Sequence, residues 1–317
     1  MFGGLSMRLK KRKLRLRKWV KVTGTILLIM LIGGGVYGAT VYNSLKTAVA
    51  AMERPMERNH SEKREEAVSL KEKDPFSVLM LGVDEREGDT GRSDTMIVLT
   101  VNPNKNSVKM LSIPRDTRTE IIGKGKEDKI NHAYAFGGIP MAMDTVENFL
   151  DIPIDYYIEV NMKGFTGLVD AVGGVKVTND LDFTQDGFHF PKGELTLNGK
   201  KALSYTRMRK EDPRGDFGRQ SRQRQIIEGV VKEGASLTSL TKFSDIFTVL
   251  GKNVKTNLTF DQMVAIQKGY KDVETSIQQM EIKEEGTRIN DIYYGLVSTE
   301  EKQRVQNELK SQLGLKK

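Results

Sequence analysis

The chain contains no cysteine, which excludes disulfide bonds, thiolate catalysis and cysteine-ligated zinc. It has only three histidines, and because His60 and His189 have no recognisable partners, a histidine metal site is not supported. The P-loop, the G-x-S-x-G nucleophile motif and the H-E-x-x-H zinc motif are also absent. Without disulfides, a chain of 317 residues must be stabilised by its core, which is feasible at this size.

Acidic residues are missing from the first 21 positions, which carry nine lysines and arginines. The formal charge of the whole chain is +8, so removing these nine cations leaves −1 for the rest. Because the basic character belongs to a tail and the remainder is nearly neutral, the composition argues against a nucleic-acid partner.

The one long uncharged run covers residues 22–42 (VTGTILLIMLIGGGVYGATVY). An α-helix of this length crosses the hydrocarbon core of a bilayer, which is about 30 Å thick. The cations precede the run, so we expect residues 1–21 to stay in the cytoplasm and the following chain to lie outside. The alternatives are a cleaved signal peptide and a buried core helix, but the apolar region of a signal peptide is usually shorter and no clear cleavage site follows.

The polar, highly charged residues 43–74 are typical of an extracellular stalk, and residues 75–317 of a folded domain. Apolar runs predict strands at 76–82, 95–101, 108–113 and 156–160. Helical spacing predicts helices at 139–150, 164–172, 198–205, 217–233, 237–250, 259–270 and 299–314. The alternation favours an α/β fold, an α/β/α sandwich around a central mixed sheet, preceded by one transmembrane helix.

Two aspartates stand where the first two predicted strands approach each other. Asp84 follows the first strand and Asp94 precedes the second, so both carboxylates can meet at one sheet edge if the strands are neighbours. Two close carboxylates repel unless a cation joins them, and oxygen ligands suit Mg²⁺. The alternative is structural, with Asp84 in an Asx-turn and Asp94 as a cap.

Further polar residues follow the third predicted strand. Pro114 ends the strand, so Arg115 leaves the sheet at its rim, where it can clamp a phosphate or simply pair with Asp116. Lys129 and Asn131, in KINHAY, are candidates for contacts with phosphate or sugar hydroxyls.

The stretch 206–225 (TRMRKEDPRGDFGRQSRQRQ) holds six arginines. Arginine matches phosphate oxygens in pairs and keeps its charge. If Arg207 and Arg209 lie on extended chain, they share one face, and Arg219 and Gln223 share a face at the start of the next helix. We therefore expect a phosphate-binding cradle at a helix N-terminus. The alternative is a solvated charged face with Asp216 as an N-cap.

Five ordered segments carry a family resemblance: FSVLMLGVDEREGDTGRSDTMIVLTVNP, KMLSIPRDT, KINHAYAFGG, LVDAVGGV and LSYTRMRKEDPRGDFGRQSRQRQ. Together, over about residues 74–250, they resemble the LytR–CpsA–Psr family of membrane-anchored cell-wall enzymes, in particular the Gram-positive teichoic acid transferases of the TagTUV type.

The resemblance implies an α/β/α sandwich with an apolar pocket for a polyprenyl chain and Mg²⁺ at its mouth. The implied reaction moves an anionic glycopolymer, such as wall teichoic acid, from a polyprenyl-diphosphate carrier to the muramic acid C6 hydroxyl of peptidoglycan. Polyprenyl phosphate is released. The implied location is the cell membrane of a Gram-positive bacterium, as a single-pass type II protein.

By motif position, the resemblance assigns Asp84 and Asp94 to the metal, and Arg115 with Asp94 to catalysis. It assigns the substrate diphosphate to Arg207, Arg209, Asp216, Arg219 and Gln223, with Lys129, Asn131 and Arg222 as further candidates. The general base stays undetermined, and an aspartate of the metal pair is one candidate.

Two other functions use the same residues. A metal-dependent pyrophosphatase would hydrolyse the carrier lipid without an acceptor. A non-catalytic receptor for wall polymer or lipid would keep the arginines but not need Asp84 and Asp94. A regulator of transcription fits poorly with an exported, nearly neutral domain.

Overall fold

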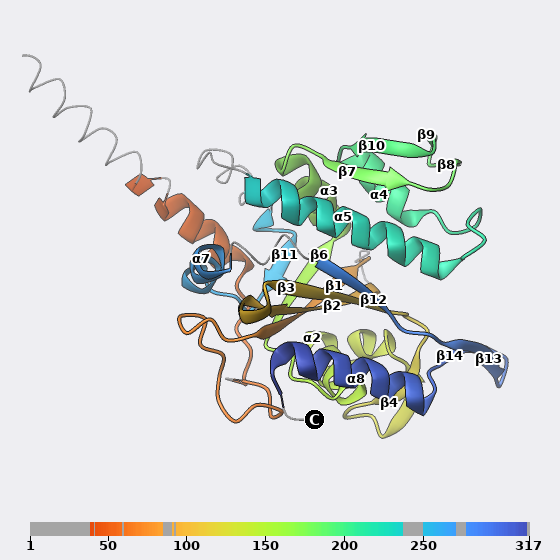
Figure 1. The fold of residues 1–317 in the computed structure, drawn as a ribbon, viewed down its shortest axis with the longest axis horizontal. Coiled ribbons are helices and arrows are strands. Elements are labelled where there is room, and N and C mark those ends of the chain that lie inside the picture. Colours follow the sequence, from red (N-terminus) through yellow and green to blue (C-terminus); the bar gives the residue numbers. More distant parts are fainter. Residues whose placement is uncertain are drawn as a thin grey trace, which may run out of the picture. The chain divides into compact units, whose positions relative to one another are not determined.

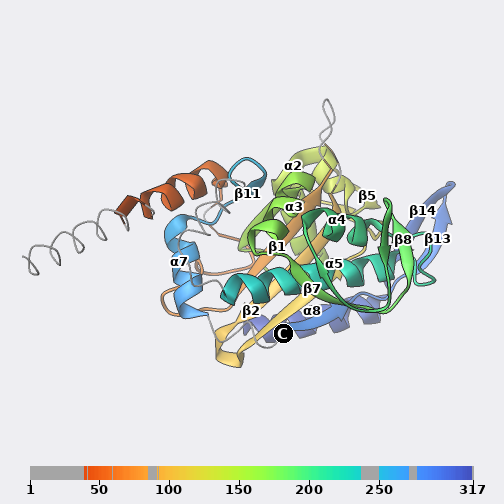
Figure 2. The same cartoon turned by 90° about the horizontal axis from the view of Figure 1, so that it is seen from above.

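The computed structural model describes residues 39–40, 42–58, 60–84, 91, 93–236, 250–270 and 277–315. Its contacts divide the chain after Ser44, and the fold described here is that of the unit that begins at Leu45 (Figure 1, Figure 2). The predicted basic tail, most of the predicted anchor at 22–42 and the predicted helix at 237–250, apart from its last residue, lie outside the described residues. Within the described ranges, no helix is long and apolar enough to cross a membrane.

A six-stranded mixed sheet forms the centre of the unit, in the order β11-β6-β1-β2-β3-β12. Its strands are β1 (Phe76–Val83), β2 (Ser93–Asn102), β3 (Ser107–Ile113), β6 (Tyr156–Asn161), β11 (Val254–Thr256) and β12 (Ile277–Glu281). β1, β2 and β3 form an antiparallel meander, β6 and β12 pair in parallel with its two outer strands, and β11 pairs antiparallel with β6. The four predicted strands of this sheet are confirmed.

Helices cover both faces of the sheet (Figure 1). On one face lie α3 (Met162–Ala171), α4 (Gly199–Arg207) and α5 (Asp216–Ser236), and on the other lie α2 (His132–Leu150) and α8 (Thr299–Leu313). α7 (Phe260–Gly269) begins with a capping box in which Thr259 and Gln262 bond each other's backbone N–H groups. The predicted α/β fold around a central mixed sheet is confirmed.

Short hairpins complete the unit, and the sequence analysis missed most of their strands. They pair β4 (Arg118–Ile121) with β5 (Lys126–Lys129), β7 (Val175–Asn179) with β10 (Gly193–Leu197), β8 (Phe183–Gln185) with β9 (Phe188–Phe190), and β13 (Glu285–Ile289) with β14 (Ile292–Leu296). Strands of three to five residues carry too little alternation to be recognised by pattern.

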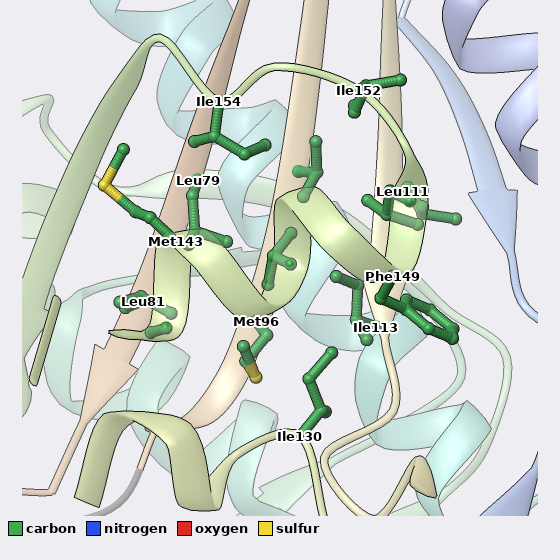
Figure 3. Close-up of a cluster of buried hydrophobic side chains, with 14 of the residues drawn as sticks. Leu79, Leu81, Met96, Leu111, Ile113, Ile130, Met143, Phe149, Ile152 and Ile154 are labelled. Atoms are coloured by element: carbon green, nitrogen blue, oxygen red, sulfur yellow. The ribbon is translucent and has the colours of Figure 1, made fainter. Parts of the chain in front are cut away.

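The largest buried cluster lies between the sheet and α2 (Figure 3). Alternate residues of each strand point to this face, as Leu79 and Leu81 of β1 and Leu111 and Ile113 of β3 do. A second cluster joins α3, α4 and α5 to their hairpins, with Phe183, Phe190 and Tyr205 stacked together. The first cluster packs α2 and α8 against the sheet, and the second packs α3, α4 and α5 against one another.

Residues 45–74, predicted as a stalk, belong in the structure to the same compact unit as the domain. Arg58 makes two hydrogen bonds to Glu147 of α2, at 2.8 and 3.0 Å. Arg64 bonds both carboxylate oxygens of Asp155, at 2.5 and 2.9 Å. The segment packs on the fold because these charges find buried partners, which charge composition alone does not reveal.

Candidate active site

A cavity of about 720 Å³ lies between the sheet and the layer of α3, α4 and α5. Most of its lining is apolar and includes Met80, Ile158, Phe165, Leu168, Ile227 and Val231. Protein interiors are normally close-packed, so an apolar cavity of this size is typical of a ligand site. Its lining follows α5 from Arg219 to Val231, which corresponds to about 18 Å along the helix axis.

The charged residues of the lining are Asp84, Asp94, Arg207 and Arg219, and its polar residues include Gln223. β1 and β2 are antiparallel neighbours, so Asp84 lies just beyond Val83, which pairs with Ser93 of β2. The register shifts between Gly82 and Val83, and this irregularity falls where Asp94 stands opposite β1. The expected meeting of the two aspartates at one sheet edge follows from this pairing.

The pair of aspartates fits a hard cation. In the part of the chain that the structure describes, no group of three or more acidic or histidine side chains gathers. A metal between Asp84 and Asp94 would therefore depend on substrate oxygens and water for its other ligands, as Mg²⁺ commonly does. The bond from Arg115 to Asp94 uses only the Oδ1 atom of that carboxylate.

Three arginines converge beside the cavity lining. Arg219 pairs with Asp216 at 2.6 Å, and Arg209 approaches the same carboxylate at 3.9 Å. Burial lowers the pKa of the Arg219 guanidinium, Asp216 opposes this, and the charges of Arg115 and Arg209 lower it further. The mutual repulsion of these cations shows that they lie within electrostatic reach of each other, which favours an anionic ligand.

Arg115 lies between two carboxylates after the end of β3. Its Nη1 donates to Asp94 at 2.8 Å, and its Nε lies 3.6 Å from Asp116. Burial by itself lowers the pKa of Arg115, but the hydrogen bond that it donates to Asp94 and the nearby negative charges raise it overall. Lys129 donates to the other oxygen of Asp116 at 2.6 Å. The sequence analysis expected Asp116 to hold Arg115, whereas Asp94 makes the shorter contact.

The predicted geometry of Arg207 and Arg209 needs a correction. Arg207 is the last residue of α4 and only Met208 and Arg209 continue as non-helical chain, so the two arginines do not share one face of a strand. Both are exposed, and Arg207 lines the cavity. The expected pairing of Arg219 with Gln223 on one helical face does occur, since both line the cavity.

The phosphate role of Arg222 is also corrected. Its side chain is 1% exposed and pairs with the fully buried Asp212 at 2.6 Å. It also donates to the carbonyl of Met208 and lies over the ring of Phe183. Arg222 does not line the cavity, among the described residues. Arg222 connects the turn before α5 to the second core. This structural role was not predicted, because Asp212 lies ten residues earlier in the sequence.

Asn131 lies beside Arg115 rather than in the cavity lining. Its backbone N–H donates to the carbonyl of Arg115 at 3.4 Å, and its side chain is buried with an Oδ1 atom that accepts no hydrogen bond. It precedes α2 without capping it. The structure thus brings Asp84, Asp94, Arg207, Arg219 and Gln223 to one cavity and links Arg115, Arg209 and Asp216 to them by ion pairs.

Two features of the site were not found from the sequence. The apolar lining comes from eight or more separate stretches of chain, so no local pattern reveals it. Glu284, in the loop between β12 and β13, lies next to the site and accepts a hydrogen bond from Thr117 at 3.2 Å. It stands in a segment whose strands were not predicted, so nothing marked it out.

Comparison with known proteins gives a consistent result. The model of the LytR_cpsA_psr family matches residues 39–311. The polyisoprenyl-teichoic acid–peptidoglycan teichoic acid transferase TagU of Bacillus licheniformis is 54% identical over 291 residues, which cover 91% of this chain and 93% of that protein. TagU of Bacillus subtilis is 53% identical over 289 residues, which cover 91% of this chain and 94% of that protein.

Solved structures agree with the sequence matches. The crystal structure of Bacillus subtilis TagU has a TM-score of 0.64 and covers 77% of this chain and 99% of its own, at 53% identity. TagT bound to LIIa-WTA has a TM-score of 0.74 and covers 83% of this chain and 100% of its own, at 33% identity. The chain belongs to the LytR–CpsA–Psr family.

Proposed function

We propose that this protein is a teichoic acid transferase that moves an anionic glycopolymer from a polyprenyl-diphosphate carrier to peptidoglycan. The observation that carries the proposal is one cavity that combines a long apolar lining with arginines and aspartates. The activity named for relatives of 53–54% identity supports it. Wall teichoic acid is the polymer we expect, and the C6 hydroxyl of muramic acid is the acceptor group.

The apolar part of the cavity suits the polyprenyl chain. About 18 Å of lining along α5 accommodates several isoprene units, and burying apolar carbon contributes about 25 cal/mol per Å². The lipid then lies with its diphosphate at the polar residues, because these are the groups that match its charge.

Arg207, Arg209 and Arg219 are the proposed ligands of the diphosphate, with Gln223 as a neutral donor. The Nε atoms of Arg115 and Arg219 are buried and make no hydrogen bond within the described structure. The other N–H groups of these guanidinium groups are the donors that a phosphate group would bind. Asp216 holds Arg209 and Arg219 in place.

Asp84 and Asp94 are the residues that would hold Mg²⁺ together with oxygens of the diphosphate. Bound there, the ion would neutralise charge on the phosphate that leaves with the lipid. Arg115 stabilises the negative charge that develops on the transferred phosphoryl group. Phosphoryl transfer depends mainly on positioning and charge neutralisation, so the chain does not need a covalent nucleophile.

A transfer assay tests the proposal. The full-length chain in detergent is mixed with a polyprenyl-diphosphate-linked disaccharide and uncrosslinked peptidoglycan. We expect release of polyprenyl phosphate together with glycan joined to peptidoglycan. Release of lipid phosphate and free phosphorylated sugar would instead identify a pyrophosphatase, and tight lipid binding without turnover would identify a receptor.

We also propose that residues 22–42 anchor the protein in the cell membrane with the domain outside. An enzyme anchored in the membrane and a prenyl substrate in the same membrane encounter each other by diffusion within the membrane plane, which is consistent with a lipid-linked donor. Protease added to intact cells should digest residues 45–317 and spare an epitope placed before residue 22. Protection of the domain would contradict this topology.

A further inference from the structure

The aspartates around the arginines are each paired with a cation. The pairs are Asp94 with Arg115 at 2.8 Å, Asp116 with Lys129 at 2.6 Å, and Asp216 with Arg219 at 2.6 Å.

Glu284 is different, because its carboxylate makes no ion pair within the described residues. Its Oε2 atom accepts a hydrogen bond from the hydroxyl of Thr117 at 3.2 Å, two residues after Arg115. The carboxylate lies against Gly295 of β14, where a Cβ atom would overlap with it. The side chain is half-buried, so it is held in place while remaining open to a substrate.

The β13–β14 hairpin fixes this position relative to Arg115. The N–H of Gly295 donates to the carbonyl of Asp116 at 2.9 Å, and Thr117 forms a β-bridge with Gly295. Glu284 therefore depends on the same turn that carries Arg115, and its distance from the arginines cannot vary freely.

The titratable groups that face Glu284 come from three elements. Asp116 faces it from the turn after β3, Asp216 from the start of α5 and Tyr293 from β14. The pKa of Glu284 is raised to about 7, mainly by burial and further by the charges of Asp116 and Asp216, while the bond from Thr117 opposes this. Tyr293 is 43% exposed. Its pKa is raised by burial and by the charges of Glu284 and Asp116, and lowered by the charge of Arg209, so the hairpin lies near Arg209.

We propose that Glu284 is the general base that accepts the proton of the peptidoglycan hydroxyl, an inference that rests on the transferase function proposed above. The carboxylate takes the proton as the hydroxyl oxygen forms a bond to the phosphorus that carries the glycopolymer. The bond from that phosphorus to the bridging oxygen of the diphosphate breaks, and its electron pair leaves on polyprenyl phosphate. The proton on Glu284 then passes to solvent.

This assignment also predicts where the acceptor approaches. The hydroxyl must come within hydrogen-bond reach of Glu284, so the glycan enters from the side of the β13–β14 hairpin. The exposed ring of Tyr293 lies on this side and offers a flat apolar surface to a sugar.

The test compares E284Q with E285Q in the transfer assay with the full-length chain. Glutamine keeps the shape of Glu284 and its bond from Thr117 but cannot take a proton, and Glu285 is the exposed neighbour on β13. E284Q should lower kcat by about 10²–10⁴-fold, the usual contribution of a general base, without weakening donor binding. E285Q should match the wild type. The wild-type kcat should rise with pH through an inflection near 7, and E284Q should lack this inflection.

A second variant separates the chemical role from a structural one. T117V removes the hydrogen bond that favours the ionised carboxylate, so it should move the inflection of kcat to higher pH. If E284Q keeps kcat within threefold of the wild type, or if T117V leaves the inflection in place, Glu284 is not the base while the transferase stands. If the wild type itself transfers nothing, the proposed function and this inference are overturned together.

Discussion

The arginines of α5 have two different environments, the cavity and the core, and their exposed fractions distinguish the two. Arg219 is 12% exposed beside the cavity and Arg222 is 1% exposed beside Asp212, although only three positions separate them on α5. Successive helical residues three apart share a face only approximately, so one arginine reaches the cavity and the other the core. Charge density alone cannot assign the two roles.

Arg115→Ala should lower transfer by at least about 10²–10³-fold, because a group that stabilises developing charge is lost. The melting temperature should change little, since Asp94 is 41% exposed and can be hydrated without its partner. Rates and thermal melts of this variant are compared with Arg118→Ala, whose pair with Glu127 lies on β4 and β5. Near-normal transfer in Arg115→Ala would remove Arg115 from the mechanism.

Asp212→Asn should destabilise the fold by about 3–5 kcal/mol at neutral pH, because Arg222 is left buried without a counter-charge. Burial raises the pKa of Asp212, but bonds from Arg214 and Arg222 outweigh this and lower it to about 2. Because the pKa of Asp212 is lower in the folded than in the unfolded protein, its ionisation stabilises the fold at pH values above its unfolded pKa near 4. This stabilisation is lost as the pH falls toward 2. Denaturation midpoints at pH 7 and pH 3 measure the effect.

The matched control for that variant is Asp180→Asn, which removes the exposed partner of Arg214. Exposed pairs contribute about 0–1 kcal/mol, so this change should be nearly silent. If both variants lose the same free energy of unfolding, the Asp212–Arg222 pair does not stabilise the fold more than the exposed pair does.

At the scale of the element, α5 contributes both polar and apolar residues to the cavity. Its first turns carry Asp216, Arg219 and Gln223 toward the polar residues, and its later turns present Ile227 and Val231 to the cavity. In the function proposed above, one helix therefore contributes both to the binding of the diphosphate and to the binding of the lipid chain.

Ile227→Trp should fill part of the cavity and raise the KM for a long-chain donor by roughly tenfold, since bulk replaces lipid contacts. A donor with a short prenyl chain should lose little. The KM for each donor is compared with that of Lys232→Trp, a variant that adds the same ring at an exposed position of α5. Equal effects on both donors would place the lipid elsewhere.

At the scale of the whole molecule, the segment before β1 is tied to the fold by buried charges. Asp155 is 5% exposed and accepts bonds from Arg64 as well as from the backbone N–H of Ser77 at the start of the sheet. The chain after the predicted anchor is therefore mechanically continuous with the sheet that carries Asp84 and Asp94.

Arg64→Ala should destabilise the domain by about 3 kcal/mol, because Asp155 loses its only cation among the described residues. Lys63→Ala, which removes a half-exposed pair with Asp151, should cost less than about 1 kcal/mol. Urea titrations of the full-length chain compare the two. A silent Arg64→Ala would mean that the Arg64–Asp155 pair does not stabilise the domain.

Local sequence determined much of this protein. Continuous apolar runs at β1, β2 and β3 and helical spacing in α3, α5 and α8 predicted these elements, because burial on a strand or helix imposes its own period. The motif residues Asp84, Asp94, Arg219 and Gln223 were also found from sequence, since their spacing along a strand end or a helix face is itself a geometric constraint.

Only the tertiary structure decided which of these residues act together. Arg222 pairs with a buried aspartate and does not line the cavity, and Glu284, in a loop about 170 residues after Arg115, accepts a hydrogen bond from Thr117. The cavity is lined by residues of α5 and by residues of β1, β2 and β6, and these elements belong to separate cores. These features arise from contacts between distant segments, and no local pattern encodes a distance between elements that meet only when the chain is folded.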